Sequence, residues 1–252
     1  MNATSLVGLA DSAAGTLLAR REDGVTRITI NRPDKLNALD PDLVDALLAV
    51  VQESHHDGTR LLVLQGAGRN FSAGFDLGDY EEQSEGDLVL RFIRVEQLLQ
   101  AVYHAPFQTL ALAHGKNFGA GVDLVCACNM RVAAEGSTFR MPGLRFGLVL
   151  GTRRLVQRIG TDCARAVLAR SINFSAGEAA AMGFVQQVGA QETWPALIQE
   201  AADAAASLSA DATAALLRVS VPDTRDADLA ELVRSASVPG LKDRLRRYRA
   251  QS

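Results

Sequence analysis

This chain of 252 residues contains little cysteine and no apolar run long enough to cross a membrane. The segment from Met1 to Ser5 lacks the charged and apolar regions of a secretory signal. Cys126 and Cys128 lie within one apolar segment, where buried thiols behave as small hydrophobic groups, and Cys163 stands apart from them. These absences predict a cytoplasmic protein that does not span a membrane.

An excess of one charge and clustered metal ligands are missing as well. The sequence has 26 basic and 29 acidic residues and only 5% aromatic residues, so it lacks the phosphate-neutralising patch of a nucleic-acid-binding protein. Its four histidines are not spaced as metal ligands, and we expect no metal site. His114 stands at the end of an expected strand, where a hydrogen-bonded structural role is the expected one.

The residues that are present favour one α/β domain followed by a helical region. Apolar residues make up 48% of the chain, which is enough to bury a full core. The segments 16–21 and 25–30 flank Asp23-Gly24 and predict a β-hairpin. Asp40 is placed to cap the helix that follows. Strands and helices alternate until about Thr193, where alanine-rich helical spacing begins.

The main functional signal is a pair of glycine-bearing segments, Phe71–Leu77 and His114–Asp123. Each follows an apolar strand-like run, at 60–65 and 107–113, so each forms a turn out of a strand. Backbone N–H groups lie free in such turns, and a buried apolar helix at 124–128 leaves donors at its start. Together the segments can hold one oxygen that becomes negative. The alternative is that the glycines serve only tight turns.

The stretches Asn31–Leu39, Phe71–Leu77 and Gly115–Leu124 occur in a characteristic order and spacing. They resemble the N-terminal signature and the two oxyanion segments of the crotonase, or enoyl-CoA hydratase/isomerase, family. Phe139–Pro142, with the glycines and the Arg154-Leu155 pair that follow it, resembles the next segment of that family. The resemblance extends from about residue 17 to about residue 188.

The resemblance implies an α/β fold, a crotonase-like spiral of repeated β-β-α units with a helical C-terminal part. Residues 1–192 would form the spiral core with the acyl-CoA site. Residues 193–252 would form helices for trimerisation or for a lid over the site. A homotrimer or a dimer of trimers is implied too. No cofactor is implied, because coenzyme A is part of the substrate.

The same resemblance assigns roles to individual positions. The backbone N–H groups of Phe75 and Ala120 would form the oxyanion hole for the thioester carbonyl. The other contacts with substrate or CoA would come from Lys35, Ala73, Asp76, Leu77, Gly119, Gly143, Lys242 and Arg244. Lys242 and Arg244 are expected from the sequence itself, because they belong to a basic C-terminal stretch that could meet the CoA phosphates; a solvated helix face is the favoured alternative for the rest of that stretch.

The carboxylates depart from the pattern of a hydratase, which uses two glutamates to hold and activate water. This chain has Asp123 at the first position and Gly143 at the second. Asp123 follows Ala120 by one helical turn, so it shares a face with the oxyanion amide and is a candidate proton-transfer group. Burial would raise its pKa and the helix N-terminus would lower it. The alternative role for Asp123 is a helix cap only.

Gly143 can act as neither acid nor base, so hydration would need another group. The polar stretch with Tyr80, Glu81 and Glu82, and Arg145, offer candidates, but each is expected to be a solvated surface residue.

The sequence therefore predicts an acyl-CoA-processing enzyme of the enoyl-CoA hydratase/isomerase group, with Asp123 moving a proton to or from a thioester enolate. A single carboxylate suits isomerisation better than hydration. Decarboxylation, C–C cleavage and thioester hydrolysis are alternatives, because one oxyanion hole serves them all. A non-catalytic acyl-CoA-binding protein is a further alternative, which a second ionisable group in the pocket would argue against.

Overall fold

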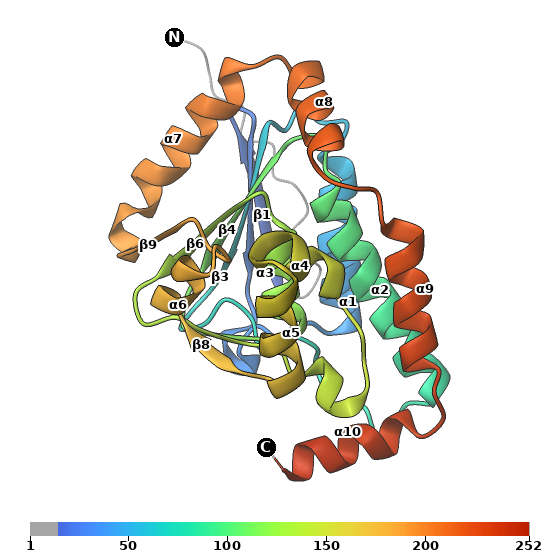
Figure 1. The fold of residues 1–252 in the computed structure, drawn as a ribbon. Helices are drawn as coiled ribbons and strands as arrows, with labels where there is room; N and C mark the ends of the chain where they lie inside the picture. Colours follow the sequence, from blue (N-terminus) through green and yellow to red (C-terminus); the bar gives the residue numbers. More distant parts are fainter. Residues whose placement is uncertain (1–14, 252) are drawn as a thin grey trace.

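The computed structural model describes residues 15–251, so the start from Met1 to Ser5 lies outside the described residues. Two sheets and a set of helices make up a mixed α/β fold (Figure 1). The larger sheet contains β1 (Leu17–Glu22), β2 (Val25–Ile30), β3 (Leu61–Gly66), β4 (Gln108–Ala113), β6 (Met130–Ala134) and β9 (Gln187–Gly189), in that order. The smaller sheet contains β5 (Lys116–Phe118), β7 (Thr138–Arg140) and β8 (Asn173–Ser175).

The helices of the first part of the chain are α1 (Pro41–Glu53), α2 (Glu85–Tyr103), α3 (Ala120–Ala127), α4 (Thr152–Ile159), α5 (Thr161–Arg170) and α6 (Ala176–Ala181). Those of the last part are α7 (Trp194–Ser207), α8 (Ala210–Ser220), α9 (Arg225–Ala236) and α10 (Leu241–Ala250). Within residues 15–251, no helix is both long and apolar enough to cross a membrane.

The predicted hairpin is confirmed. β1 and β2 pair antiparallel, and Asp23 and Gly24 between them both have positive φ, at 48° and 76°. That conformation suits a two-residue turn whose twist matches the strands. All later pairs of the large sheet, from β2–β3 to β6–β9, are parallel. The carboxyl ends of β3 and β4, from which the two glycine-bearing segments leave, therefore lie at one edge of the sheet.

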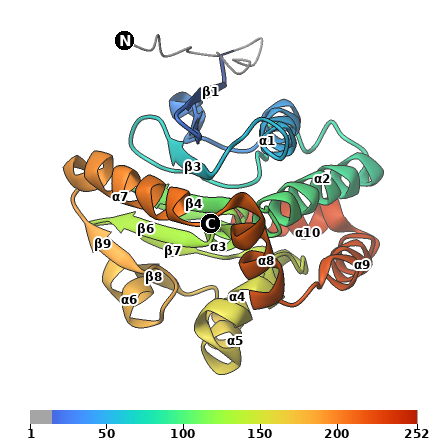
Figure 2. The same ribbon diagram turned by 90° about the horizontal axis from the view of Figure 1, so that it is seen from above.

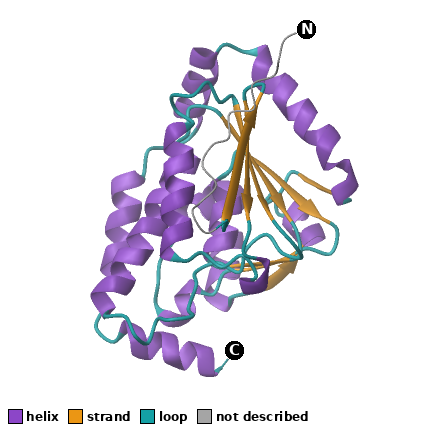
Figure 3. Cartoon of the chain, turned by 180° about the vertical axis from the view of Figure 1, so that it is seen from behind, coloured by secondary structure: helices purple, strands orange, loops and turns teal. Residues whose placement is uncertain are grey.

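Helices cover both faces of the large sheet. Leu62 and Leu64 of β3 belong to a core shared with α1, α2 and α3, whereas Leu61 and Val63 belong to a second core with Trp194 of α7. This alternation follows from the period of two in a strand. Figures 1 and 3 show α7 on one side of the sheet and α1 and α2 on the other. The predicted cap of α1 is also present, since Asp40 accepts a hydrogen bond from the Leu43 N–H at 2.9 Å.

The last helices return to the first part of the chain. α9 packs along α2 (Figure 2), and α10 packs against a short 3-10 helix at Gly143–Phe146. Leu241 and Leu245 of α10 form a third apolar cluster with Tyr80 and Phe92. The C-terminal part therefore covers the region that follows the first glycine-bearing segment.

Candidate active site

Hydrogen bonds between backbones bring the family-like segments side by side. The Leu39 N–H donates to the Gly74 carbonyl at 2.7 Å, and the Asp76 N–H donates to the Leu39 carbonyl at 3.1 Å. The Phe118 N–H donates to the Ser72 carbonyl at 3.1 Å. The first glycine-bearing segment thus lies between the N-terminal signature and the second segment.

Gly74 sets how closely the two glycine-bearing segments approach. Its φ is +78°, and a Cβ added there would lie 2.3 Å from the Phe118 carbonyl oxygen and 3.0 Å from the Ala120 nitrogen. Only glycine fits such a position. Phe75 follows directly, so its amide and that of Ala120 belong to one junction. Within residues 15–251, neither N–H donates a hydrogen bond to a backbone carbonyl.

Asn37 supports this junction from the N-terminal signature. Its side chain is fully buried and donates to the carbonyls of Ala67 and Asn70 at 2.8 and 2.7 Å, while it accepts from the Arg32 N–H at 2.8 Å. Arg32 in turn forms an ion pair with Asp76 at 2.9 Å. Asp76, expected at the CoA path, therefore braces the loop through its side chain.

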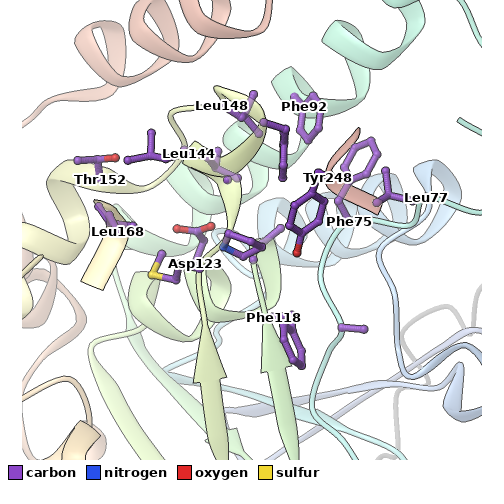
Figure 4. A pocket seen from close by; sticks show the side chains of 18 residues that line it. Phe75, Leu77, Phe92, Phe118, Asp123, Leu144, Leu148, Thr152, Leu168 and Tyr248 are labelled. Atoms are coloured by element: carbon purple, nitrogen blue, oxygen red, sulfur yellow. The ribbon is translucent and has the colours of Figure 1, made fainter. Parts of the chain in front are cut away.

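A cavity of about 200 Å³ opens at this junction (Figure 4). Seven of the predicted site residues line it together: Ala73, Phe75, Leu77, Gly119, Ala120, Asp123 and Gly143. The rest of the lining is apolar except for Thr152 and Tyr248. In Figure 4, Asp123 lies between Leu168 and Thr152 on one side and Phe75 and Tyr248 on the other. Among the lining residues described, Asp123 and Tyr248 are the ionisable ones.

Asp123 stands in the first turn of α3 and is 3% exposed. Burial raises the pKa of its carboxyl well above the usual range, while the Arg154 guanidinium lowers it and the Glu96 carboxylate raises it by smaller amounts. Burial therefore outweighs the attraction of the Arg154 guanidinium for the charged carboxylate. Its Oδ1 is buried and has no hydrogen-bond partner among the described residues. A helix cap would accept a hydrogen bond from a backbone N–H of the first turn, and α3 has no side-chain cap hydrogen bond.

Gly151 makes room for the Asp123 carboxyl. A Cβ added at Gly151 would lie 1.9 Å from Asp123 Oδ1, and the residue has φ +66° at the start of α4. In the sequence, Gly151 is only one of the glycines that follow Pro142 in the family-like pattern. Its contact with the carboxyl depends on packing between α3 and α4, which the sequence does not reveal.

A buried ion pair lies behind Asp123. Arg154 donates from Nη1 and Nη2 to the two carboxylate oxygens of Glu96, at 2.9 and 2.5 Å, and both residues are 1% exposed. Asp228 of α9 is 3.5 Å from the same guanidinium. Glu96 was missed at the sequence level. The sequence signal for its burial is that an acidic residue stands next to Val95, among the apolar residues on the buried face of α2.

The remaining predicted CoA contacts lie elsewhere in the fold. Lys35 is exposed on a 3-10 turn. Lys242 donates from Nζ to the carbonyls of Glu81 and Gln83, at 2.6 and 2.9 Å. Arg244 donates from Nε to the Phe146 carbonyl at 2.9 Å. These two side chains tie α10 to neighbouring backbone.

Tyr80 corrects one expectation. It is not a solvated surface residue but is 2% exposed, and its hydroxyl donates to Glu81 at 2.9 Å. Its burial follows from the apolar cluster it forms with α2 and the C-terminal helices, and the Arg249 guanidinium covers its ring at 5.4 Å. His114 is structural as expected, with Nε2 3.0 Å from the Gly68 carbonyl oxygen. In the described part of the chain, no three acidic, His or Cys side chains group as metal ligands would.

The chain belongs to the enoyl-CoA hydratase/isomerase family, whose family model matches residues 20–234. A protein named as a probable enoyl-CoA hydratase in Mycobacterium leprae is 32% identical over 67% of this chain and 69% of its own length. A probable enoyl-CoA hydratase of Rhodobacter capsulatus is 34% identical over 65% of this chain and 64% of its own length. The matched region thus spans about two thirds of these relatives.

Solved structures agree with the family. An enoyl-CoA hydratase/isomerase structure from Bordetella parapertussis is 53% identical, with a TM-score of 0.93 over 94% of this chain and 99% of that one. An enoyl-CoA hydratase from Bacillus halodurans, 21% identical, shares the fold with a TM-score of 0.82 over 92% of this chain and 99% of that one. The expected crotonase-like α/β fold is confirmed.

Proposed function

We propose that this protein acts on an acyl-CoA thioester, with the amides of Phe75 and Ala120 binding the carbonyl oxygen and Asp123 transferring the proton. The observation that carries the proposal is a buried carboxyl with a raised pKa in the same cavity as the junction of the two glycine-bearing segments. Donors aimed at an oxygen that gains charge stabilise an enolate strongly in a cavity with little water.

Isomerisation of an enoyl thioester is the reaction that one carboxylate can complete. Asp123 as carboxylate would take a proton from C2 of a 3-enoyl thioester, and the electron pair would pass to the thioester oxygen as a dienolate. The same carboxyl would return the proton at C4 and leave a 2-enoyl thioester. Hydration needs a second group to hold water, and Gly143 offers no side chain for that role.

Tyr248 favours an enzyme over a simple binding protein. Its side chain comes from α10 and lines the cavity, so a phenol accompanies the Asp123 carboxyl. A pocket wholly apolar around Asp123 would have favoured the binding-protein alternative, which rests on Gly143 at the position of the second glutamate. We propose further that Ala73, Leu77, Gly119 and Gly143 contact the thioester, since they line the same cavity.

The test compares wild type with Asp123→Asn on saturated, 2-enoyl, 3-enoyl and malonyl-type CoA thioesters in deuterated water, with products followed by mass spectrometry. We expect interconversion of 2-enoyl and 3-enoyl thioesters, reduced about a hundredfold or more in Asp123→Asn while thioester binding persists. Turnover of malonyl-type thioesters alone would replace isomerisation by decarboxylation. Equal turnover by both proteins would overturn the role of Asp123, and tight binding without turnover would favour the binding protein.

A further inference from the structure

A second cavity, of about 190 Å³, lies on the other side of Phe75 from the candidate active site. Leu39, Val44 of α1 and Val95 of α2 provide apolar walls for it. Asp45 and Arg94 line it too, and they form an ion pair at 2.7 Å with side chains 56% and 38% exposed. The second cavity thus combines apolar walls with the buried Arg91 side chain and with a charged pair at a rim that faces water.

Phe75 lines both cavities, and its ring is held between two neighbouring side chains of α2. The ring of Phe92 stacks on it, with 4.2 Å between centroids and 22° between planes. The Arg91 guanidinium carbon lies over the ring, 4.2 Å from its centroid. Two groups of that size cannot both sit at this distance on one face of a ring. The ring is therefore sandwiched.

The two sides of this sandwich belong to different cavities. Phe92 lines the first cavity and Arg91 lines the second, so the Phe75 ring stands as a partition between them. Arg91 is itself fixed, because it is 8% exposed and donates to the Asp76 carbonyl at 2.6 Å. A stacked aromatic ring and a fixed cation keep the partition closed.

Building on the proposed acyl-CoA function, we infer that the Phe75 side chain limits the length of the acyl group by separating the active-site cavity from a second acyl subsite. The amide and the ring of Phe75 then have separate roles, one at the thioester carbonyl and one at the end of the acyl pocket. The apolar walls beyond the partition match a methylene chain. Removal of the ring joins the two cavities and admits longer acyl groups.

Isothermal titration with saturated acyl-CoA thioesters, from butanoyl to hexadecanoyl, tests this without turnover. In wild type, affinity should stop rising at the length that reaches Phe75. In Phe75→Ala the rise should continue to longer chains, with about tenfold tighter binding for every two methylenes that enter the second cavity. Circular dichroism verifies that each variant is folded.

Two variants make the test specific to the partition. Phe118→Ala removes a ring that lines the first cavity only, and should leave the length limit in place. Leu90 lines the second cavity and is 56% exposed. In the double variant Phe75→Ala with Leu90→Trp, affinity should stop rising at a shorter acyl chain than in Phe75→Ala alone. An unchanged length profile in Phe75→Ala, or the same extension in Phe118→Ala, overturns the partition alone. No binding of any thioester by wild type overturns the proposed function together with it.

Discussion

At the scale of single residues, the chemistry of Asp123 depends on its burial. The raised pKa means that the folded protein binds the proton of this carboxyl more tightly than the unfolded chain does. Its contribution to stability is therefore fully present below the ordinary carboxyl pKa of about 3.9, and it is lost as the pH rises through the raised folded pKa. As the pH rises through the folded pKa, a growing fraction of Asp123 is in the carboxylate form that proton abstraction needs.

In Asp123→Asn, the free energy of unfolding should therefore depend less on pH than it does in wild type. Asparagine keeps the shape of the side chain but cannot ionise, so the melting temperature of the variant should fall less than that of wild type as the pH rises. Each kcal/mol of difference corresponds to roughly 2–4 °C for a chain of this size. Thermal melts over a pH series measure it. Parallel curves for the two proteins would contradict a buried carboxyl with a raised pKa.

Gly151 offers a test of how finely the carboxyl is placed. In Gly151→Ala the new methyl would overlap Asp123 Oδ1, so the carboxyl must move and turnover should fall by about tenfold or more. Gly240→Ala is the matched control, because Gly240 is also a helix N-cap in the left-handed region, with φ +83° and ψ 29° against +66° and 2° at Gly151, but an added Cβ there meets nothing within 4 Å. Steady-state rates of both variants, compared at equal folded fraction, separate displacement of Asp123 from backbone strain. Equal losses of turnover would refute the contact.

At the scale of elements, the Glu96–Arg154 pair joins α2 to α4 behind the site. Glu96→Gln should lower the free energy of unfolding by about 3 kcal/mol, because the buried guanidinium loses its bidentate partner and keeps only Asp228, at 3.5 Å. Asp45→Asn breaks the exposed ion pair between Asp45 of α1 and Arg94, which lies on α2 like Glu96. It should lower the free energy of unfolding by at most about 1 kcal/mol. Urea unfolding of both variants measures the difference. If Glu96→Gln lowers the free energy of unfolding as little as Asp45→Asn does, the Glu96–Arg154 pair does not stabilise the packing of α2 against α4.

Local elements were predictable because their signals lie within a few residues. The β1–β2 turn at Asp23-Gly24 and the cap of α1 at Asp40 are examples, and the structure confirms both. The glycine-bearing segments were predictable as one site, since both follow strands that end at the same sheet edge. Tyr248 was not, because only the return of α10 along the fold brings it to the cavity.

Tyr80 shows why a polar sequence context misleads. Glu81 and Glu82 follow it and suggest solvent, whereas its burial comes from α2 and from two helices that lie more than 140 residues later in the chain. The Phe75 partition is likewise a tertiary feature. It needs α2 to place Phe92 and Arg91 on opposite faces of one ring.

At the scale of the whole molecule, the helices that end the chain have two different surroundings. α9 packs against α2, and α10 packs against the 3-10 helix Gly143–Phe146 at the cavity. α8 instead exposes apolar side chains, with Leu216 and Val219 50% and 76% exposed. Apolar side chains that gather on one exposed helix mark a contact surface in many proteins. The family resemblance makes other copies of this chain the expected partner.

Light scattering after size-exclusion chromatography should therefore give a mass of three or six times the 26.9 kDa chain. Leu216→Asp with Val219→Asp places two charges on the exposed face of α8 and should shift the mass toward one chain, since burying unpaired charges in an interface is costly. Val238→Asp serves as the control, because Val238 is 51% exposed but stands between α9 and α10. A wild-type mass of one chain would contradict the trimer. An unchanged mass in the α8 variant would place the contact on another surface.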